Sequence, residues 1–166
     1  MLHQRYIFLH VFSFSLGSLL ETLPGVVFYL VVVQAVETAL TEEQHQRALL
    51  LSLRLNEDSL IQKCILSVKP ADIPAVASSI PFRYLQRLME ALSNLLENSP
   101  HLEFILRWCQ EFCKAHGHSI QENFRTLHPA LRSLNKAITR AHQDLAETCS
   151  SNLYSLRYLT TTITKD

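Results

Sequence analysis

The chain has 166 residues, which is enough for one modest domain, or one domain plus an extra segment. Apolar residues make up 48% and charged residues 18%, a balance that favours a packed core and excludes a disordered chain. Lys plus Arg and Asp plus Glu each number 15, which argues against a protein whose whole surface binds nucleic acid but leaves room for a local basic patch. Three glycines are too few for glycine-rich phosphate loops, and four cysteines are too few for a disulfide framework.

Residues 1–36 form an apolar N-terminal segment. Two apolar runs, Tyr6–Leu20 and Val26–Val36, are separated by Glu21 and a Pro-Gly pair. Neither run reaches the roughly 20 residues that a membrane-spanning helix needs, and joining them would place Glu21 at mid-depth. Arg5 precedes the first run as in a signal peptide, but no small-x-small cleavage site follows. A membrane role is therefore not favoured; a membrane-anchored or secreted helical protein stays as the alternative function, and we expect Val26–Val36 to be helical.

From residue 37 the sequence predicts amphipathic helices with short connections. Thr41 and Gln44 form a capping box that starts the first helix, and Asn56 ends it. The second helix begins at Asp58 or Ser59 and ends before a proline at position 70.

The middle of the chain predicts three more helices. Asp72 caps a short one that has Pro74 in its first turn. A longer helix follows, and its apolar stripe runs over Phe82–Leu96 in steps of three and four. Ser99-Pro100 provides the N-cap and first residue of the next helix, which Gly117 ends.

The last helix is predicted to be the longest, with Thr126 as its cap and Pro129 in its first turn. Apolar residues then alternate in steps of four and three, a heptad pattern typical of a helix packed at a shallow angle along another helix. Its positions are Leu127, Leu131, Leu134, Ile138, Ala141 and Leu145. Cys149, Leu153, Leu156 and Leu159 extend the pattern, but a polar run at 150–152 weakens that extension.

These elements predict an all-α fold of about six helices, arranged as an antiparallel helical bundle or a short solenoid of helical pairs. The helical body covers residues 37–160, preceded by the apolar segment 1–36 and followed by a frayed tail, 161–166.

Two groups of residues suggest a ligand. Cys109, Cys113, His116 and His118 have ligand types suited to zinc, but no glycine knuckle separates the cysteines, so we predict buried cysteines on an apolar stripe and no metal site.

The second group is a basic row in which Arg132, Lys136 and Arg140 recur every four residues, extended by Arg125 and His128. Such a row suits RNA phosphates. It also suits a solvated helix face on which Arg140 pairs with Asp144 four residues later, and no aromatic platform lies on the row for base stacking.

No catalytic constellation is present in the sequence, which lacks both the G-x-S-x-G elbow and the H-E-x-x-H pattern. Glu103 beside Phe104 and Trp108 could be a carboxylate in an apolar pocket, but we interpret it as a polar residue on the outer edge of its helix. The sequence therefore predicts a protein that is not an enzyme and needs no cofactor.

Three stretches are more specific. They are ALTEEQHQRALLLSLRLNEDSLI (Ala39–Ile61), IPAVASSIPFRYLQRL (Ile73–Leu88) and HLEFILRWCQ (His101–Gln110). In this order and with these gaps, they resemble the C-terminal helical domain of the periodic tryptophan WD-repeat proteins, and more closely that of a member which is a component of the small-subunit processome. The resemblance covers about Ala39–Leu159. The WD propellers of that family have no counterpart, since Trp108 is the only tryptophan and no Trp-Asp dipeptide exists, so we expect a fragment, a truncated product or a stand-alone copy.

The resemblance implies a scaffold in the nucleolus. It implies association with other WD-repeat subunits of the processome, indirect association with the U-three small nucleolar RNA and pre-ribosomal RNA, and support of small-subunit assembly. From the residues, we expect the partner to bind an apolar helical surface. Our candidate partner-binding residues are Tyr84, Phe104, Trp108, Leu127, Leu131, Leu134, Ile138 and Leu145. Trp108 suits the domain core and an interface equally.

Overall fold

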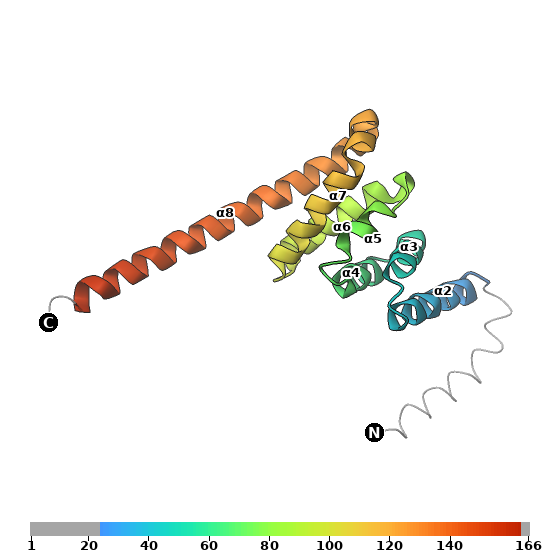
Figure 1. Ribbon diagram of the computed structural model, residues 1–166, viewed down its shortest axis with the longest axis horizontal. Coiled ribbons are helices and arrows are strands. Elements are labelled where there is room, and N and C mark those ends of the chain that lie inside the picture. Colours follow the sequence, from blue (N-terminus) through green and yellow to red (C-terminus); the bar gives the residue numbers. More distant parts are fainter. Residues whose placement is uncertain (1–23, 164–166) are drawn as a thin grey trace, which may run out of the picture.

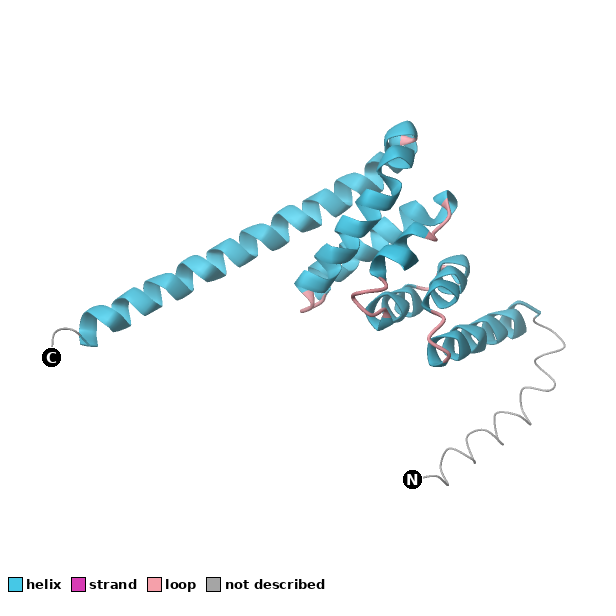
Figure 2. Ribbon diagram, viewed as in Figure 1, coloured by secondary structure: helices cyan, strands magenta, loops and turns pink. Residues whose placement is uncertain are grey.

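The computed structural model describes residues 24–163, and every regular element in this range is a helix (Figures 1 and 2). The all-α prediction is confirmed. The elements are α2 (Pro24–Thr41), α3 (His45–Leu55), α4 (Asp58–Ser67), α5 (Ile73–Ser78), the 3-10 helix η1 (Phe82–Tyr84), α6 (Leu85–Asn98), α7 (Leu102–Glu122) and α8 (Phe124–Ile163).

Helix α6 is the centre of the fold, since it contacts α4, α7 and α8. It has a strongly one-sided apolar face, and eight of its residues are buried. Helix α5 packs along α7, while α2 packs along α3 at the other end of the molecule. The predicted stripe is confirmed from Leu85 onward, but its first member is exposed: Phe82 lies in η1, before the α-helix begins.

Helix α2 confirms that Val26–Val36 is helical, and it extends past the predicted boundary at residue 36 because Val36 and Ala39 are buried in the core. The predicted capping box is wrong. Thr41 is the last residue of α2, and its hydroxyl donates to the carbonyl of Thr38 (2.7 Å). Residues 1–23 lie outside the described part of the chain. No helix in the described part is long and apolar enough to cross a membrane.

Two helices end on residues other than glycine with positive φ. The amide of Gln44 donates to Ala39 O and that of Glu43 to Leu40 O, with Glu43 left-handed at φ 57°, the arrangement of a Schellman motif. The predicted stop at Asn56 is confirmed, at φ 62°. Glycine usually holds such positions because it has no Cβ, and asparagine adopts them more readily than most residues, so the backbone strain falls mainly on Glu43.

Gly117 does not end its helix, contrary to the prediction. Helix α7 runs on to Glu122 because Ile120 is buried and the ring of His116 is hydrogen-bonded to the carbonyl of Ala77 on α5 (2.8 Å). The start of α7 is also two residues later than predicted, with His101 at the N-cap. The periodicity of the apolar residues, rather than the glycine, decides where α7 ends.

We expect Gly117→Ala to stabilise the chain by about 0.5–1 kcal/mol, since glycine in a helix interior loses more backbone entropy on folding than alanine. A Cβ built at Gly117 meets nothing within 4 Å, so the methyl group adds no clash. Urea unfolding followed by circular dichroism measures the change. Gly117→Pro should destabilise by at least about 3 kcal/mol, and a Gly117→Ala variant less stable than the parent would contradict the prediction.

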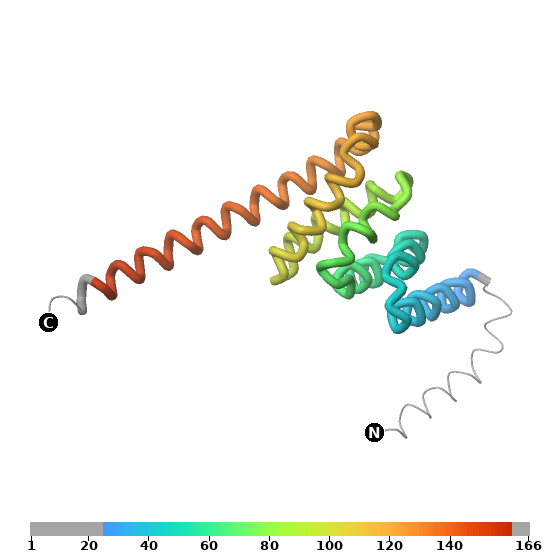
Figure 3. Tube along the Cα trace, viewed as in Figure 1, coloured from blue at the N-terminus to red at the C-terminus, as the bar shows by residue number. Residues whose placement is uncertain are grey.

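Helix α8 begins at Phe124, earlier than the predicted cap at Thr126, so Pro129 lies inside the helix rather than in its first turn. Its 40 residues make a rod of about 60 Å. The first half packs on α6 and α7, and the second half projects away from the body (Figures 1 and 3). The polar run at 150–152 does not interrupt it, and the helix continues into the segment predicted to be a frayed tail.

Candidate interaction surface

The heptad pattern of α8 is divided between a covered and an uncovered part. Leu127 and Leu134 are each 2% exposed, and Leu131 and Ile138 are partly buried against the core. Leu145, the last predicted member, is 53% exposed. Leu127 and Leu134 must therefore be removed from the candidate partner surface, because they already pack within this domain.

The three aromatic candidates have different environments. Trp108 is fully buried and belongs to the core, which corrects its assignment as an interface anchor. Its indole N–H has no hydrogen-bond partner in the described structure. Phe104 and Tyr84 are half-buried against the core, and the guanidinium of Arg83 lies 4.7 Å from the ring centroid of Tyr84. Of the three, only Phe104 and Tyr84 have surface left for a partner.

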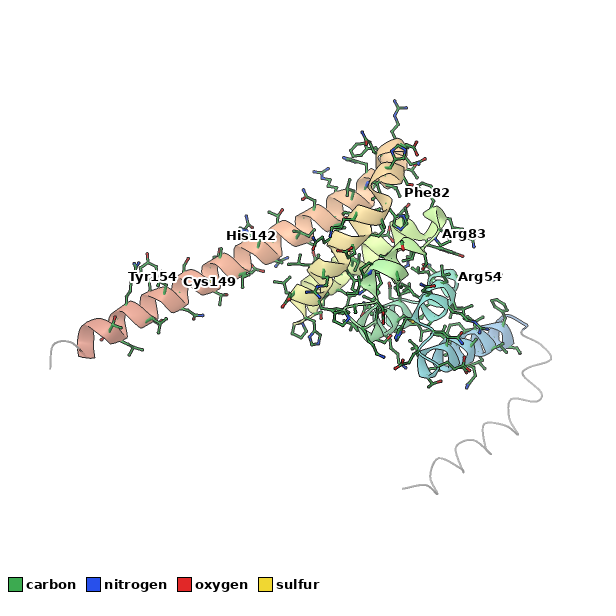
Figure 4. The ribbon with its side chains drawn as sticks, viewed as in Figure 1. Arg54, Phe82, Arg83, His142, Cys149 and Tyr154 are labelled. Carbon is green, nitrogen blue, oxygen red and sulfur yellow. The ribbon has the colours of Figure 1, made fainter. Side chains whose placement is uncertain are left out.

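The uncovered half of α8 carries an apolar surface that we call the distal ridge. Its members recur in steps of three and four, so they lie along one side of the helix in continuation of the packed heptad positions. They are Leu145, Cys149, Leu153, Leu156 and Leu159, all exposed. Cys149 and Tyr154 lie on the part of α8 that no other described helix covers (Figure 4). The sequence showed this pattern, and the continuous helix across residues 150–152 is what makes it a single surface.

A second apolar surface lies on the first turns of α2. It adjoins residues 1–23, which the structure does not describe, so we base no function on it. Its exposed members are Val26, Phe28, Tyr29, Leu30 and Val31.

The cysteine and histidine cluster is not assembled into a site. Cys109 is buried, and burial together with the neighbouring Cys113 raises the pKa of its thiol to about 12, so the thiolate that would bind zinc is disfavoured. His116 bonds to a carbonyl, and His118 lies 3.2 Å from Glu122. Among the described residues, no group of three or more His, Cys, Asp or Glu side chains could hold a metal ion.

The side chain of Glu103 is 92% exposed and 3.8 Å from Arg107, as expected for a residue on the outer edge of its helix. The described surface also has hollows. One of about 490 Å³ lies between α5, α3 and the turn that precedes α3, and is bordered by His45 and Asp72. Another, of about 270 Å³, lies between the end of α6 and α8 and is bordered by Glu97, Arg140 and Asp144.

The basic row is exposed along α8. Arg125, Arg132, Lys136 and Arg140 all face solvent, and none forms an ion pair within the described part of the chain. The pairing of Arg140 with Asp144 that helix spacing suggested is not formed. The basic side chains on other helices are mostly paired; Lys63, for example, is 2.6 Å from Glu37.

Comparison with known proteins identifies the family of the chain. The profile of the Dip2/Utp12 family matches residues 56–161. The chain is 72% identical over 126 residues to periodic tryptophan protein 2 of Arabidopsis thaliana, a match that covers 76% of the chain and 14% of that protein. It is 36% identical to the Saccharomyces cerevisiae protein and 32% identical to the Mus musculus homologue, each over 124 residues, 75% of the chain and 13% and 14% of those proteins.

The chain therefore spans only about a seventh of the length of these relatives. The resemblance carried by three separate stretches is confirmed by these relatives, and the family profile extends without a break from the end of α3 almost to the end of α8. By this match over more than half of its length, the chain belongs to the Dip2/Utp12 family.

Proposed function

We propose that the chain is a non-catalytic scaffold domain in ribosome biogenesis, located in the nucleolus. Its role is to associate through helices with other WD-repeat subunits of the small-subunit processome, and so to support pre-ribosomal RNA processing and small-subunit assembly. Family membership and similarity to periodic tryptophan protein 2 support the setting. Association with the U-three small nucleolar RNA is indirect in this proposal.

The distal ridge is the observation that carries the proposal. Leu145, Leu153 and Leu156 are each about half exposed or more, on a helix that extends beyond the body that buries its first half. Burying a large aliphatic side chain contributes about 1.5–3 kcal/mol. The four leucines of the ridge together reach the same range as the estimated cost of association, about 4–15 kcal/mol. The ridge therefore supports association that is strengthened by further contacts, for which Tyr84 and Phe104 remain candidates.

The test is capture of named partners from nucleolar extract by the full chain, with proteins identified by mass spectrometry. We expect WD-repeat subunits of the processome among them, and a loss of at least about ten-fold for Leu145→Glu with Leu156→Glu, because a charge buried in an apolar contact is not compensated. Tyr154→Glu is the matched control, since Tyr154 lies nine residues from Leu145 and on the opposite side of α8. Recovery of no WD-repeat subunit, or equal loss in the control, rejects the proposal.

A further inference from the structure

The first half of α8 carries positive charge and no negative charge. Between Phe124 and Arg140 it carries four basic residues and no acidic residue. The first turn of α8 has no acidic residue either, so the positive end of the helix dipole adds to this charge. The chain as a whole is neutral, which makes this a local concentration of positive charge.

The basic side chains of the row are available to a ligand because they form no ion pairs within the described part of the fold. Elsewhere in the fold, Lys63 on α4, Lys69 just after α4 and Lys114 on α7 each lie within 2.8 Å of a glutamate oxygen. The basic row forms no such pairs within the described residues. Arg140 is the member of the row whose charge is most nearly balanced by acidic residues, because it borders the same hollow as Glu97 and Asp144.

An aromatic pair lies at the start of the row. Phe124 is 49% exposed, and its ring meets that of His128 edge to face, with 5.0 Å between the ring centroids. His128 is itself a member of the row and is exposed. The exposed aromatic surface that the sequence did not reveal is therefore present, one residue before Arg125.

From these observations we propose that the outer face of α8, over Phe124–Arg140, binds single-stranded nucleic acid. Successive members of the row are three or four residues apart and line about 23 Å of the helix, so they follow a phosphate backbone. Phe124 and His128 provide the surface on which an unpaired base stacks, which a duplex does not offer. These contacts do not read the 2′-hydroxyl, so RNA and DNA strands are both ligands.

This site does not rest on the proposed scaffold function. Lys136 and Leu145 are nine residues apart, about two and a half turns, and so point to opposite sides of α8. A partner helix on the distal ridge and a strand on the basic row are compatible, and each can be removed without the other.

The test is fluorescence anisotropy of the full chain with labelled 12-mers of uridine RNA and thymidine DNA, titrated between 50 and 200 mM salt. Four phosphate contacts predict a slope of log affinity against log salt of about −3, from about −0.7 per contact. Arg132→Gln with Lys136→Gln should halve the slope and weaken binding about ten-fold at the lower salt concentration. Phe124→Ala should weaken binding about ten-fold with the slope unchanged, because stacking releases no counterions.

The control is Lys69→Gln with Lys114→Gln, which removes the same charge from exposed ion pairs elsewhere, and we expect it to bind like the parent. Leu145→Glu with Leu156→Glu should also bind like the parent, so failure of the scaffold proposal leaves this one standing. The proposal is overturned if the control weakens binding as much as the row variant, or if a duplex of equal length binds more tightly. It is also overturned if a glutamate 12-mer binds as well as the strands, an outcome that would indicate an acidic protein partner.

Discussion

Trp108→Ala should lower the free energy of unfolding by about 3–5 kcal/mol, a large part of the stability of a domain of this size. Trp108 is 0% exposed in α7 and belongs to the same core as Leu88, Leu92 and Phe112. Truncation leaves a cavity that the packed helices around it cannot fill. Urea unfolding followed by circular dichroism at the helical band measures the loss, because the variant has no tryptophan left for fluorescence.

Trp108→Phe is the matched variant, and it should cost much less, about 1–2 kcal/mol. It keeps most of the apolar volume and removes an indole N–H that is buried without a hydrogen-bond partner, whose desolvation opposes folding in the parent. If Trp108→Ala still folds with less than about 1 kcal/mol lost, Trp108 is not a core residue. An equal cost for both variants would contradict the prediction, because it would show that the apolar volume kept by phenylalanine does not stabilise the core.

Leu134→Ala should destabilise the domain by about 2–5 kcal/mol, while Leu145→Ala should change its stability by less than about 0.5 kcal/mol. The two leucines are on the same helix and in the same heptad pattern. Leu134 is 2% exposed where α8 packs on the body, whereas Leu145 is 53% exposed beyond it. The same substitution therefore measures where the domain core ends along α8.

Urea unfolding of both variants at the same protein concentration gives this comparison. A second measurement at ten-fold higher concentration shows whether association contributes, since a partner-stabilised chain becomes more stable with concentration. A large loss for Leu145→Ala at low concentration would mean that the ridge packs within its own chain. That result would also remove the basis for the proposed scaffold surface.

The helices of this chain could be predicted because apolar residues recur in steps of three and four, and because Asn56 and Asp72 lie at their boundaries. The predicted helix boundaries that depend on tertiary contacts are wrong. Thr41 looked like a cap because of Gln44, yet the burial of Val36 and Ala39 extends α2 through it. Nothing local predicts the left-handed Glu43, whose side chain has no preference for that conformation and instead pairs with Lys69.

The candidate surface could be predicted only in part. The heptad pattern runs through the covered and uncovered halves of α8 alike, so periodicity identifies an apolar stripe but not what covers it. Leu127 and Leu134 are buried, whereas Leu153 and Leu156 are exposed. The polar run at 150–152 had weakened the prediction that the pattern extends to Leu153 and Leu156. Trp108 suited core and interface equally because large apolar side chains stabilise both.

The projecting half of α8 has a thermodynamic consequence. Most helical stability in proteins comes from tertiary packing of an apolar face rather than from the helix propensity of the residues. Beyond Ala141 every side chain described is exposed, and serine, asparagine and threonine are poor helix formers. Amide protons in this half therefore exchange by local unwinding rather than by opening of the whole domain. A protein that binds the distal ridge must therefore also stabilise the helical conformation of this half of α8. Binding of the partner and formation of the helix are then one coupled equilibrium.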